Sequence, residues 1–413
     1  MWTPDSVVPV YGRSVAMAEK REVVIVGAAR TPIGAFLGSL SSLPAPKLGA
    51  VAIKAALERS GVKPDDVELV IMGNVLQAGV GQAPARQAMI HAGVPEKTPA
   101  VTLNKVCGSG LESVIHAARA ILVGDADVAV AGGMESMSNA PYLLPKARWG
   151  HKMGDGSVKD LMIYDGLTCT FTGVHMGTYG NSCAKEMEIS REAQDEWSYQ
   201  SHQKALAAIE NGLYAQEIVP VEIPQRKGDP IVVKDDESPR KDTSLERLAK
   251  LKPVFDHDGT ITAGNAPGVN DGAAALVLMS EERAASEGKE VLATIIGHTS
   301  IAVEAKDFPK TPGLVIEELL KKTGKKVEDI DLFEINEAFA AVALASAKIA
   351  GLNLEKVNVN GGAVALGHPI GASGARIIIS LVHELKRRGG GIGIASICSG
   401  GGQGDAIMVE VKC

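Results

Sequence analysis

Aromatic residues are scarce in this chain: Phe, Trp and Tyr make up only 4% of its 413 residues. Basic residues are also in the minority, with 42 Lys and Arg against 49 Asp and Glu and a formal net charge of −7. This balance argues against a nucleic-acid-binding protein, which neutralises phosphates with Lys and Arg. It leaves room for a small anionic ligand, which needs only a local basic patch and a helix N-terminus. No apolar run reaches about 18 residues, so the sequence predicts no membrane-spanning helix.

Cysteines are few and scattered. The chain has five of them: Cys107, Cys169, Cys183, Cys398 and Cys413. No two form a C-x-x-C pair, so neither a zinc site nor a disulfide scaffold is indicated. Scattered cysteines in a long chain fit a reducing compartment, and we expect the cytoplasm, with the mitochondrial matrix as the alternative. Residues 1–20 hold neither an apolar signal core nor an Arg-rich transit helix, so we interpret them as a flexible tail or as an extension upstream of a start at Met17.

Glycine, by contrast, is abundant, at 46 residues. A Gly-rich, aromatic-poor chain favours an α/β protein with tight turns between strands and helices. Short, largely β-branched runs predict strands at 23–26, 69–72, 128–131, 274–279, 294–297 and 392–396. Helical patterns lie between them at 48–60, 111–122, 313–323, 338–350 and 372–388. This alternation predicts mostly parallel sheets covered by helices, and the length predicts two or three packed units.

A faint internal repeat relates two parts of the chain. A strand at 101–104 leads into a loop of small residues that holds Cys107, followed by a helix and a strand. A strand at 357–360 leads into a similar loop that holds His368, again followed by a helix and a strand. The repeat predicts two similar halves that face each other, although a repeat this weak also arises by chance.

The stretch 141–262 differs from the rest because it is richer in charge, Trp, Tyr and Pro. It contains one good helix, at about 191–211, with Ser190 placed to cap its N-terminus. We interpret it as a loop domain inserted into an N-terminal domain at 21–288, which is followed by a C-terminal domain at 289–413.

Cys107 is the first candidate for chemistry. It stands in Lys-Val-Cys-Gly-Ser-Gly, directly before the predicted helix. A thiol at a helix start feels the positive end of the helix dipole, which favours the reactive thiolate. The alternative is a buried structural cysteine in a tight turn.

His368 is the second candidate, in the run Gly-His-Pro-Ile-Gly-Ala-Ser-Gly at 367–374, which opens another helix. Pro369 fixes the backbone after it, and the glycines clear space for a substrate. A lone histidine is more often structural than catalytic, so both interpretations stay open.

Two further stretches carry polar groups at strand ends. Cys398 is followed by a Gly-rich turn whose successive N–H groups can bind an anion, although such a turn can also serve tight sheet packing. In 334–339, the Asn336 amide could hold a water molecule and Glu337 could orient a histidine, with an N-cap as the simpler reading of Asn336. Two cysteines, a histidine and an anion-binding turn together suit acyl transfer and proton removal beside a thioester carbonyl.

Four motifs in this order resemble the thiolase family. They are Val-Cys-Gly-Ser-Gly at 106–110, Asn-Glu-Ala-Phe at 336–339, the run at 367–374 and Cys-Ser-Gly-Gly-Gly at 398–402. The resemblance extends over about 21–412. It implies an α/β thiolase fold with five αβαβα layers, built from two similar halves with a loop domain inserted in the first. It also implies a homo-oligomer, usually a tetramer.

The resemblance further implies a role for each candidate. Cys107 would carry the acyl group, His368 would activate it, and Cys398 would be the general acid and base at the substrate α-carbon. Asn336 would hold a water in one oxyanion hole together with His368, and the N–H groups of Cys107 and Gly400 would form the other. No metal or redox cofactor enters, and coenzyme A is a substrate.

The stretch His-Met-Gly at 175–177 resembles the acetoacetyl-CoA branch of the family. The substrate and coenzyme A contacts expected on this basis are His175, Met176, Arg240, Lys241, Asp242, Ala266, Pro267, Phe308 and Phe339. Two features depart from the branch. Pro267 stands where a Ser is common, so that hydroxyl contact is absent. His202 aligns with the Tyr of the potassium-activated type, which puts potassium activation in doubt.

The expected activity is the reversible condensation of two acetyl-CoA molecules to acetoacetyl-CoA and CoA through an acetyl group on Cys107. A broader 3-ketoacyl-CoA thiolase of fatty-acid degradation is one alternative. A β-ketoacyl synthase would share the fold but needs a second catalytic His where this chain has Asn336. A non-catalytic acyl-CoA-binding protein is a third alternative, against which the intact Cys107, His368 and Cys398 argue. Phe308 and Pro309 resemble a pair found in thiolases that also cleave 2-methylacetoacetyl-CoA, although Phe308 can equally serve only to pack its loop.

Overall fold

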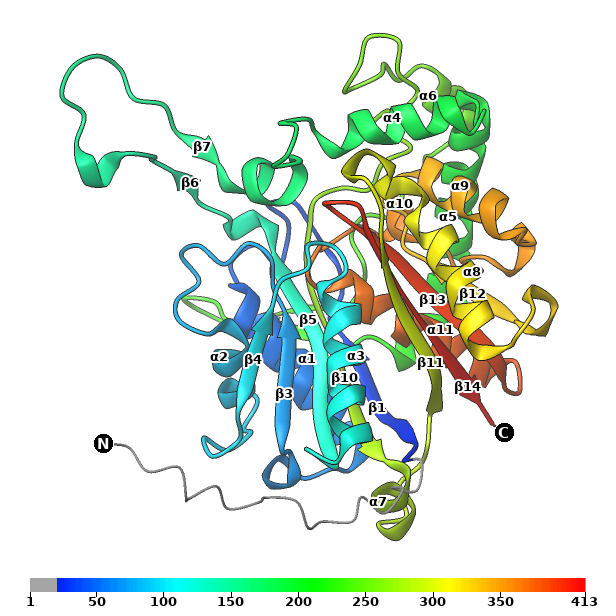
Figure 1. Ribbon diagram of the computed structural model, residues 1–413. Helices are drawn as coiled ribbons and strands as arrows, with labels where there is room; N and C mark the ends of the chain where they lie inside the picture. Colours follow the sequence, from blue (N-terminus) through cyan, green and yellow to red (C-terminus); the bar gives the residue numbers. More distant parts are fainter. Residues whose placement is uncertain (1–20, 413) are drawn as a thin grey trace, which may run out of the picture.

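The computed structural model describes residues 21–412, so the predicted tail at 1–20 and Cys413 lie outside the described residues. The N-terminal half contributes strands β1 (Val23–Arg30), β2 (Gly34–Ala35), β3 (Leu69–Gly73), β4 (Ala100–Leu103), β5 (Val128–Ser136) and β10 (Asn270–Ser280). The C-terminal half contributes β11 (Ala293–Ala302), β12 (Leu332–Ile335), β13 (Gly391–Ser399) and β14 (Gln403–Val411). Hydrogen bonds join these strands in the order β12-β13-β14-β11-β1-β10-β5-β3-β4, with β2 beside β10 (Figure 1).

Helices cover and separate the two halves of this sheet. They are α1 (Ala45–Ser60), α2 (Pro84–His91), α3 (Ser109–Val123), α7 (Glu281–Ser286), α8 (Thr311–Thr323), α9 (Ala340–Ala350), α10 (Ala363–Leu366) and α11 (Ser373–Arg387). One core lies between α1, α2 and the N-terminal strands, and another between α8, α9 and the C-terminal strands. The middle core packs α3 against α11 between the two sets of strands. The resulting order, helix–sheet–helix–sheet–helix, confirms the predicted five layers.

Strand direction differs from the prediction. The pairs β3–β4, β3–β5 and β12–β13 are parallel, but β1–β10, β10–β5, β1–β11, β11–β14 and β13–β14 are antiparallel. The expectation of mostly parallel sheets is therefore wrong. One tight hairpin, β13–β14, and the long insertion before β10 return the chain in the opposite direction, whereas helical crossovers would have kept it parallel.

The second copy of the predicted repeat also lacks its first strand. Within 357–360 only Val357 pairs, in an isolated bridge with Phe333. Asn358 has a φ of 45°, which ends the extended backbone, and its side chain bonds both the N–H and the C=O of Ile335. An Asn tolerates this left-handed conformation better than other residues with a Cβ.

The segment between β5 and β10 lies over one end of the sheets (Figure 1). It holds α4 (Met176–Glu186), α5 (Arg191–Glu210), α6 (Leu245–Ala249) and the hairpins β6 (Tyr142–Leu143)–β7 (Lys159–Asp160) and β8 (Val221–Ile223)–β9 (Ile231–Val233). Ser190 caps α5 as predicted, since its side chain accepts from the N–H of Ala193. The β6–β7 hairpin and its tip form an arm that extends away from the body (Figure 1).

A buried ion cluster ties this segment to the N-terminal half. The Arg30 guanidinium contacts Asp236 at 2.8 Å and Glu217 at 3.0 Å, and all three side chains are almost fully buried. Such pairs fix geometry more than they add stability, because burial costs each charge its hydration.

Among the described residues, one helical stretch, Val106–Val123, is long and apolar enough to cross a membrane. It contains α3, which packs in the middle layer of the fold, and 61% of it is buried.

Candidate active site

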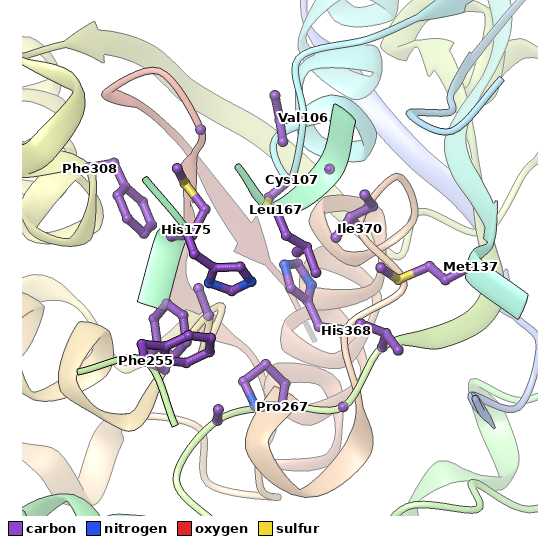
Figure 2. Close-up of a pocket in the computed structure, with 18 residues that line it drawn as sticks. Val106, Cys107, Met137, Leu167, His175, Phe255, Pro267, Phe308, His368 and Ile370 are labelled. Carbon is purple, nitrogen blue, oxygen red and sulfur yellow. The ribbon is translucent and has the colours of Figure 1, made fainter. Parts of the chain in front are cut away.

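One cavity, open to the surface and about 780 Å³ in volume, lies where the two halves and the inserted segment meet. Figure 2 shows Cys107, His368 and His175 directed into it, with Phe308 and Phe255 on one side and Met137 and Ile370 on the other. Nine predicted site residues line it: Cys107, His175, Met176, Ala266, Pro267, Phe308, Phe339, His368 and Gly400. Cys398, Asn336 and the stretch 240–242 are not part of the lining.

Cys107 sits in a constrained turn before α3. Val106 has a φ of 48°, a strained conformation for a β-branched residue, of the kind that clusters at functional sites. The Ser109 hydroxyl braces the turn by accepting from Lys105 N at 2.8 Å and donating to Val106 O at 2.6 Å. The backbone N–H groups of Cys107 and Gly400 lie near the Cys107 sulfur and lower the pKa of its thiol.

Burial raises the pKa of the Cys107 thiol to about 12, and the nearby Glu135 charge adds to the effect. The expectation that the start of α3 favours the thiolate covers one contribution only, and burial outweighs it. The two N–H groups lower the pKa but do not offset the loss of hydration. A base must take the thiol proton as the reaction begins.

His368 lines the same cavity as Cys107 and has a ring nitrogen that can accept a proton. Its backbone N–H donates to Asn270 Oδ1 at 2.9 Å, which fixes the loop. Its Nδ1 lies 2.6 Å from the Ser373 hydroxyl, whose own hydrogen goes to Pro369 O at 3.0 Å. The hydroxyl thus accepts from Nδ1–H, which assigns the other nitrogen, Nε2, as an unprotonated acceptor. Nε2 is buried and has no hydrogen-bond partner among the described residues.

The charge state of His368 fits this role. Burial, aided by the Arg376 charge, lowers its pKa to about 3. The imidazole is therefore neutral at pH 7 and can accept a proton. The resting pair is a thiol beside a neutral imidazole, and the proton moves only when a substrate supplies a partner for the new charge.

Cys398 and Gly400 come from the β13–β14 hairpin. Gly401 and Gly402 both have a φ of 80°, which glycine adopts without strain and which lets the turn reverse within three residues. Cys398 is fully buried in an apolar cluster with Phe308 and Phe339. Burial, and next the neighbouring Cys107, raise its pKa well above the usual range. Cys398 therefore lies behind the cavity wall as a neutral thiol near Cys107.

Asn336 follows β12, and its N–H donates to Ser396 O at 3.0 Å. Its side-chain oxygen and nitrogen are both buried, and neither has a partner among the described residues. The N-cap alternative is wrong, because α9 starts only after Phe339. A buried amide without a protein partner calls for a water or a ligand, which agrees with the implied role in holding a water.

The suggestion that Glu337 orients a histidine is wrong. Its carboxylate is fully buried and accepts from four groups. They are Trp197 Nε1 at 2.9 Å, Ser201 Oγ at 3.0 Å, Asn358 Nδ2 at 2.8 Å and Val364 N at 2.9 Å. Glu337 thus joins α5 to the C-terminal half, whereas Ser373 orients the histidine.

His175 and Met176 open α4 over the cavity. His175 Nδ1 accepts from Gly177 N at 3.0 Å, and its ring stacks on Phe255 with centroids 4.3 Å apart. Phe308 lies in a short 3-10 helix, Ala305–Lys310, and is buried. Sequence reasoning missed the wall residues Phe255, Met137, Leu167 and Ile370. Ile370 stands inside the run 367–374, but Phe255 and Leu167 carry no local signal.

The stretch Arg240 to Asp242 is exposed and lies outside the cavity lining. The backbone N–H of Arg240 donates to His202 Nδ1 at 3.1 Å. Burial, with the Arg240 charge, lowers the pKa of His202 to about 4, so this ring is a neutral acceptor. The predicted contact of 240–242 with the coenzyme A nucleotide stays a prediction.

Comparison with known proteins gives the family. The family model "Thiolase, N-terminal domain" matches residues 23–282, and "Thiolase, C-terminal domain" matches 289–411. A Cupriavidus necator protein named acetyl-CoA acetyltransferase is 54% identical over 95% of this chain and 100% of its own length. A Staphylococcus epidermidis protein named probable acetyl-CoA acyltransferase is 48% identical over 94% of this chain and 98% of its own. The crystal structure of the Bacillus anthracis acetyl-CoA acetyltransferase superimposes with a TM-score of 0.93, at 44% identity over 95% of this chain and 99% of that one. The chain belongs to the thiolase family.

Proposed function

We propose that this protein is an acetyl-CoA C-acetyltransferase that condenses two acetyl-CoA molecules to acetoacetyl-CoA and CoA, reversibly, through an acetyl group on Cys107. The observation that carries the proposal is the meeting of three groups in one cavity. A thiol, two backbone N–H groups near it and an imidazole nitrogen without a partner among the described residues are what acyl transfer from a thioester requires. The names of the relatives support the choice of acetyl-CoA.

The first half-reaction moves an acetyl group to the enzyme. His368 Nε2 takes the Cys107 proton while the sulfur attacks the thioester carbonyl. The N–H groups of Cys107 and Gly400 hold the oxygen that becomes negative. The carbon–sulfur bond to CoA then breaks, and the departing CoA sulfur takes the proton of Cys398. This leaves acetyl-Cys107, a protonated His368 and a Cys398 thiolate.

The second half-reaction forms the carbon–carbon bond. The Cys398 thiolate removes the α-proton of a second acetyl-CoA, and the enolate oxygen is held by protonated His368 and a water on Asn336. The α-carbon attacks the acetyl carbonyl, and the bond to the Cys107 sulfur breaks. Cys107 regains its proton from His368, so every group returns to its starting state. No step needs a metal or a redox cofactor, and EDTA is expected to leave the rate unchanged.

A chain-length series in the thiolysis direction tests this proposal. Acetoacetyl-CoA absorbance is expected to fall only when CoA is present, with kcat/KM declining steeply for longer 3-ketoacyl-CoA substrates. Equal kcat/KM for long chains would favour the broader degradative thiolase. No CoA-dependent loss with any chain length would leave only a binding protein on a thiolase fold.

A second substrate tests the acyl pocket. Phe308 presents a flat apolar face to the cavity, stiffened by Pro309, and we propose that it leaves room for a methyl group on the α-carbon. Comparable kcat/KM for 2-methylacetoacetyl-CoA and acetoacetyl-CoA would support this. A loss of ~100-fold for the branched substrate would show that Phe308 only packs its loop.

We also propose that the protein is a cytoplasmic homotetramer and that the arm at 141–160 takes part in assembly. The arm exposes large apolar side chains: Tyr142 is 68% exposed, Trp149 85% and Met153 98%. Exposed apolar groups gathered on one arm mark a contact surface. Light scattering after chromatography tests this. Replacing Trp149 and Met153 by Ser is expected to give smaller particles, and an unchanged mass would remove the arm from the interface.

A further inference from the structure

The proposed oxyanion hole is assembled from two loops that are distant in the sequence. The Cys107 N–H belongs to the turn before α3, and the Gly400 N–H belongs to the β13–β14 turn. A pair of donors stabilises a developing charge only if their separation is already fixed, because rearrangement during the reaction would cost part of the gain. The two loops must therefore be held against each other.

The Lys105 side chain makes that connection. Its ammonium group lies 2.6 Å from Asp405 Oδ1 on β14 and 2.9 Å from Glu112 Oε2 on α3. Lys105 stands two residues before Cys107. Asp405 is paired across the hairpin with Ile397, the neighbour of Cys398. One buried ion bridge thus spans the two reactive loops.

The surroundings make this bridge rigid. The side chains of Lys105, Glu112 and Asp405 are only 16%, 8% and 0% exposed. Charge-assisted hydrogen bonds are strong where water is excluded. Asp405 also packs directly on the turn, since a Cβ added at Gly108 would lie 2.5 Å from Asp405 Oδ2. A second, neutral link runs from Gly108 N to Ser399 Oγ at 2.8 Å.

We propose that Lys105 and Asp405 are positioning residues, which set the separation between the Cys107 and Gly400 N–H groups and so determine how well the acyl-transfer transition state is stabilised. This inference rests on the proposed function. Glu112 binds the same ammonium group from α3, and its contact with the C-terminal half is to the Ser300 hydroxyl on β11 at 3.3 Å, outside the β13–β14 hairpin. Its replacement therefore leaves the contact of Lys105 with the hairpin in place. The chain therefore supplies its own control.

The variants to compare are Asp405→Asn, Lys105→Gln, Lys105→Arg and the control Glu112→Gln. Each is mixed with acetyl-CoA, and the rate of acetyl labelling of Cys107 is followed by intact mass beside the melting temperature. Asp405→Asn and Lys105→Gln are expected to lower the maximal labelling rate about 10- to 100-fold with little change in the half-saturating acetyl-CoA concentration, as loss of an oxyanion donor would. Lys105→Arg, which keeps the charge, and Glu112→Gln are expected to stay within about threefold of wild type.

Equal losses in Asp405→Asn and Glu112→Gln, or an effect on half-saturation alone, would overturn the inference. If one variant fails to fold, the comparison between the two Lys105 substitutions decides. Acylation by the small thioester S-acetyl-N-acetylcysteamine separates the inference from the proposed function. If the wild-type enzyme is acylated but forms no acetoacetyl-CoA, the proposed function is contradicted, while the labelling rates still test the positioning role of Lys105 and Asp405. If the wild-type enzyme is never acylated at Cys107, the proposed function and the positioning role are both overturned.

Discussion

The two central helices, α3 and α11, are the same length, 15 residues, and each begins with a serine beside a reactive residue. Their serines do different work. Ser109 braces only the backbone of the Cys107 turn, whereas Ser373 binds the ring of His368 and sets its tautomer. In the proposed mechanism, the repeated scaffold thus presents the nucleophile from one half and its base from the other. The repeated strand–loop–helix unit places Cys107 and His368 at equivalent positions, and the residues in contact with each side chain determine what it can do chemically.

The first turns of α3 and α11 also pack directly against each other. A Cβ added at Gly110 would lie 2.9 Å from Ala375 N, and one added at Gly374 would collide with Leu111 N. These glycines let the two helix starts pass at backbone distance. Because Cys107 and His368 stand just before those starts, the crossing brings them into one cavity.

The largest loss of activity is expected when the proposed nucleophile is removed. Cys107→Ala is expected to abolish acetyl labelling and to lower turnover by at least about 10³-fold, because Cys107 is the only thiol among the residues that line the cavity. Intact mass and peptide mapping check the label. The substitution of the buried Cys183 by Ala, in the same assay, controls for loss of a thiol elsewhere. Residual labelling of Cys107→Ala would mean that another residue carries the acetyl group.

Removal of the base comes next. His368→Gln keeps a polar side chain of similar size but cannot take a proton at neutral pH. We expect kcat to fall roughly 10²- to 10⁴-fold, the usual contribution of general base catalysis. Steady-state thiolysis measures it, with circular dichroism to show that the fold is kept. A fall of less than about threefold would exclude His368 as the base.

The two serines give a sharper and smaller test. Ser373→Ala removes the acceptor for His368 Nδ1–H, so the ring loses its fixed tautomer. A lost hydrogen bond of about 1.4 kcal/mol corresponds to a tenfold lower kcat, with KM unchanged. Ser109→Ala is the matched control, and its effect is expected on thermal stability more than on kcat. If Ser373→Ala and Ser109→Ala had the same kinetics, Ser373 would not act by orienting the His368 ring.

The smallest effect concerns pH and one histidine on each of the two helices. His116 on α3 is 47% exposed by side chain, whereas His383 on α11 is only 7% exposed and neither of its nitrogens has a partner among the described residues. Burial, with Arg59 and other cations, lowers the pKa of His383 to about 4. Because the pKa of His383 is higher in the unfolded chain than in the folded protein, the unfolded chain binds the proton at a higher pH. The stability linked to His383 is complete above pH 6.5 and is lost between about pH 6.5 and 4.

Urea unfolding at pH 7 and pH 4.5 measures this effect. His383→Gln is expected to lose roughly 2 to 3 kcal/mol less than wild type over that interval, since a shift of one pKa unit corresponds to ~1.4 kcal/mol. His151→Gln on the exposed arm is the control. An unchanged acid sensitivity in His383→Gln would show that the ring is already charged in the folded protein.

Much of the fold and site could be predicted because short motifs carry local physics. Gly-rich turns, helix starts and β-branched runs identified the predicted strands, the central helices and Cys107 and His368 as candidates, and the resemblance to thiolases added Gly400. The errors arose where distant parts of the chain decide the outcome. Strand direction depends on how the insertion returns the chain to the sheet. The charge state of Cys107 depends on burial, which outweighs the helix dipole.

The cavity walls show the same limit. Phe255 reaches the site only by stacking on His175, 80 positions earlier in the sequence, and nothing in its own neighbourhood signals this contact. Glu337 stands in a recognisable motif, yet its partners come from α5 and from 358–364, so its part in joining them could not be read locally. Contacts between residues that are distant in the sequence could therefore not be predicted, even where the local motif was clear.

In the proposed mechanism, Cys107 carries the acetyl group and Cys398 moves the α-proton, and the variant Cys398→Ala separates these two roles. The variant is mixed with acetyl-CoA, and both the acetyl label and the formation of acetoacetyl-CoA are measured. Acyl transfer needs only Cys107, His368 and the two N–H groups, with water able to protonate the departing CoA. Carbon–carbon bond formation also needs the α-proton removed. We expect the Cys398→Ala variant to carry an acetyl group on Cys107 and to form no acetoacetyl-CoA. Condensation within a few-fold of wild type, or an acetyl group mapped to Cys398 in the wild type, would contradict it.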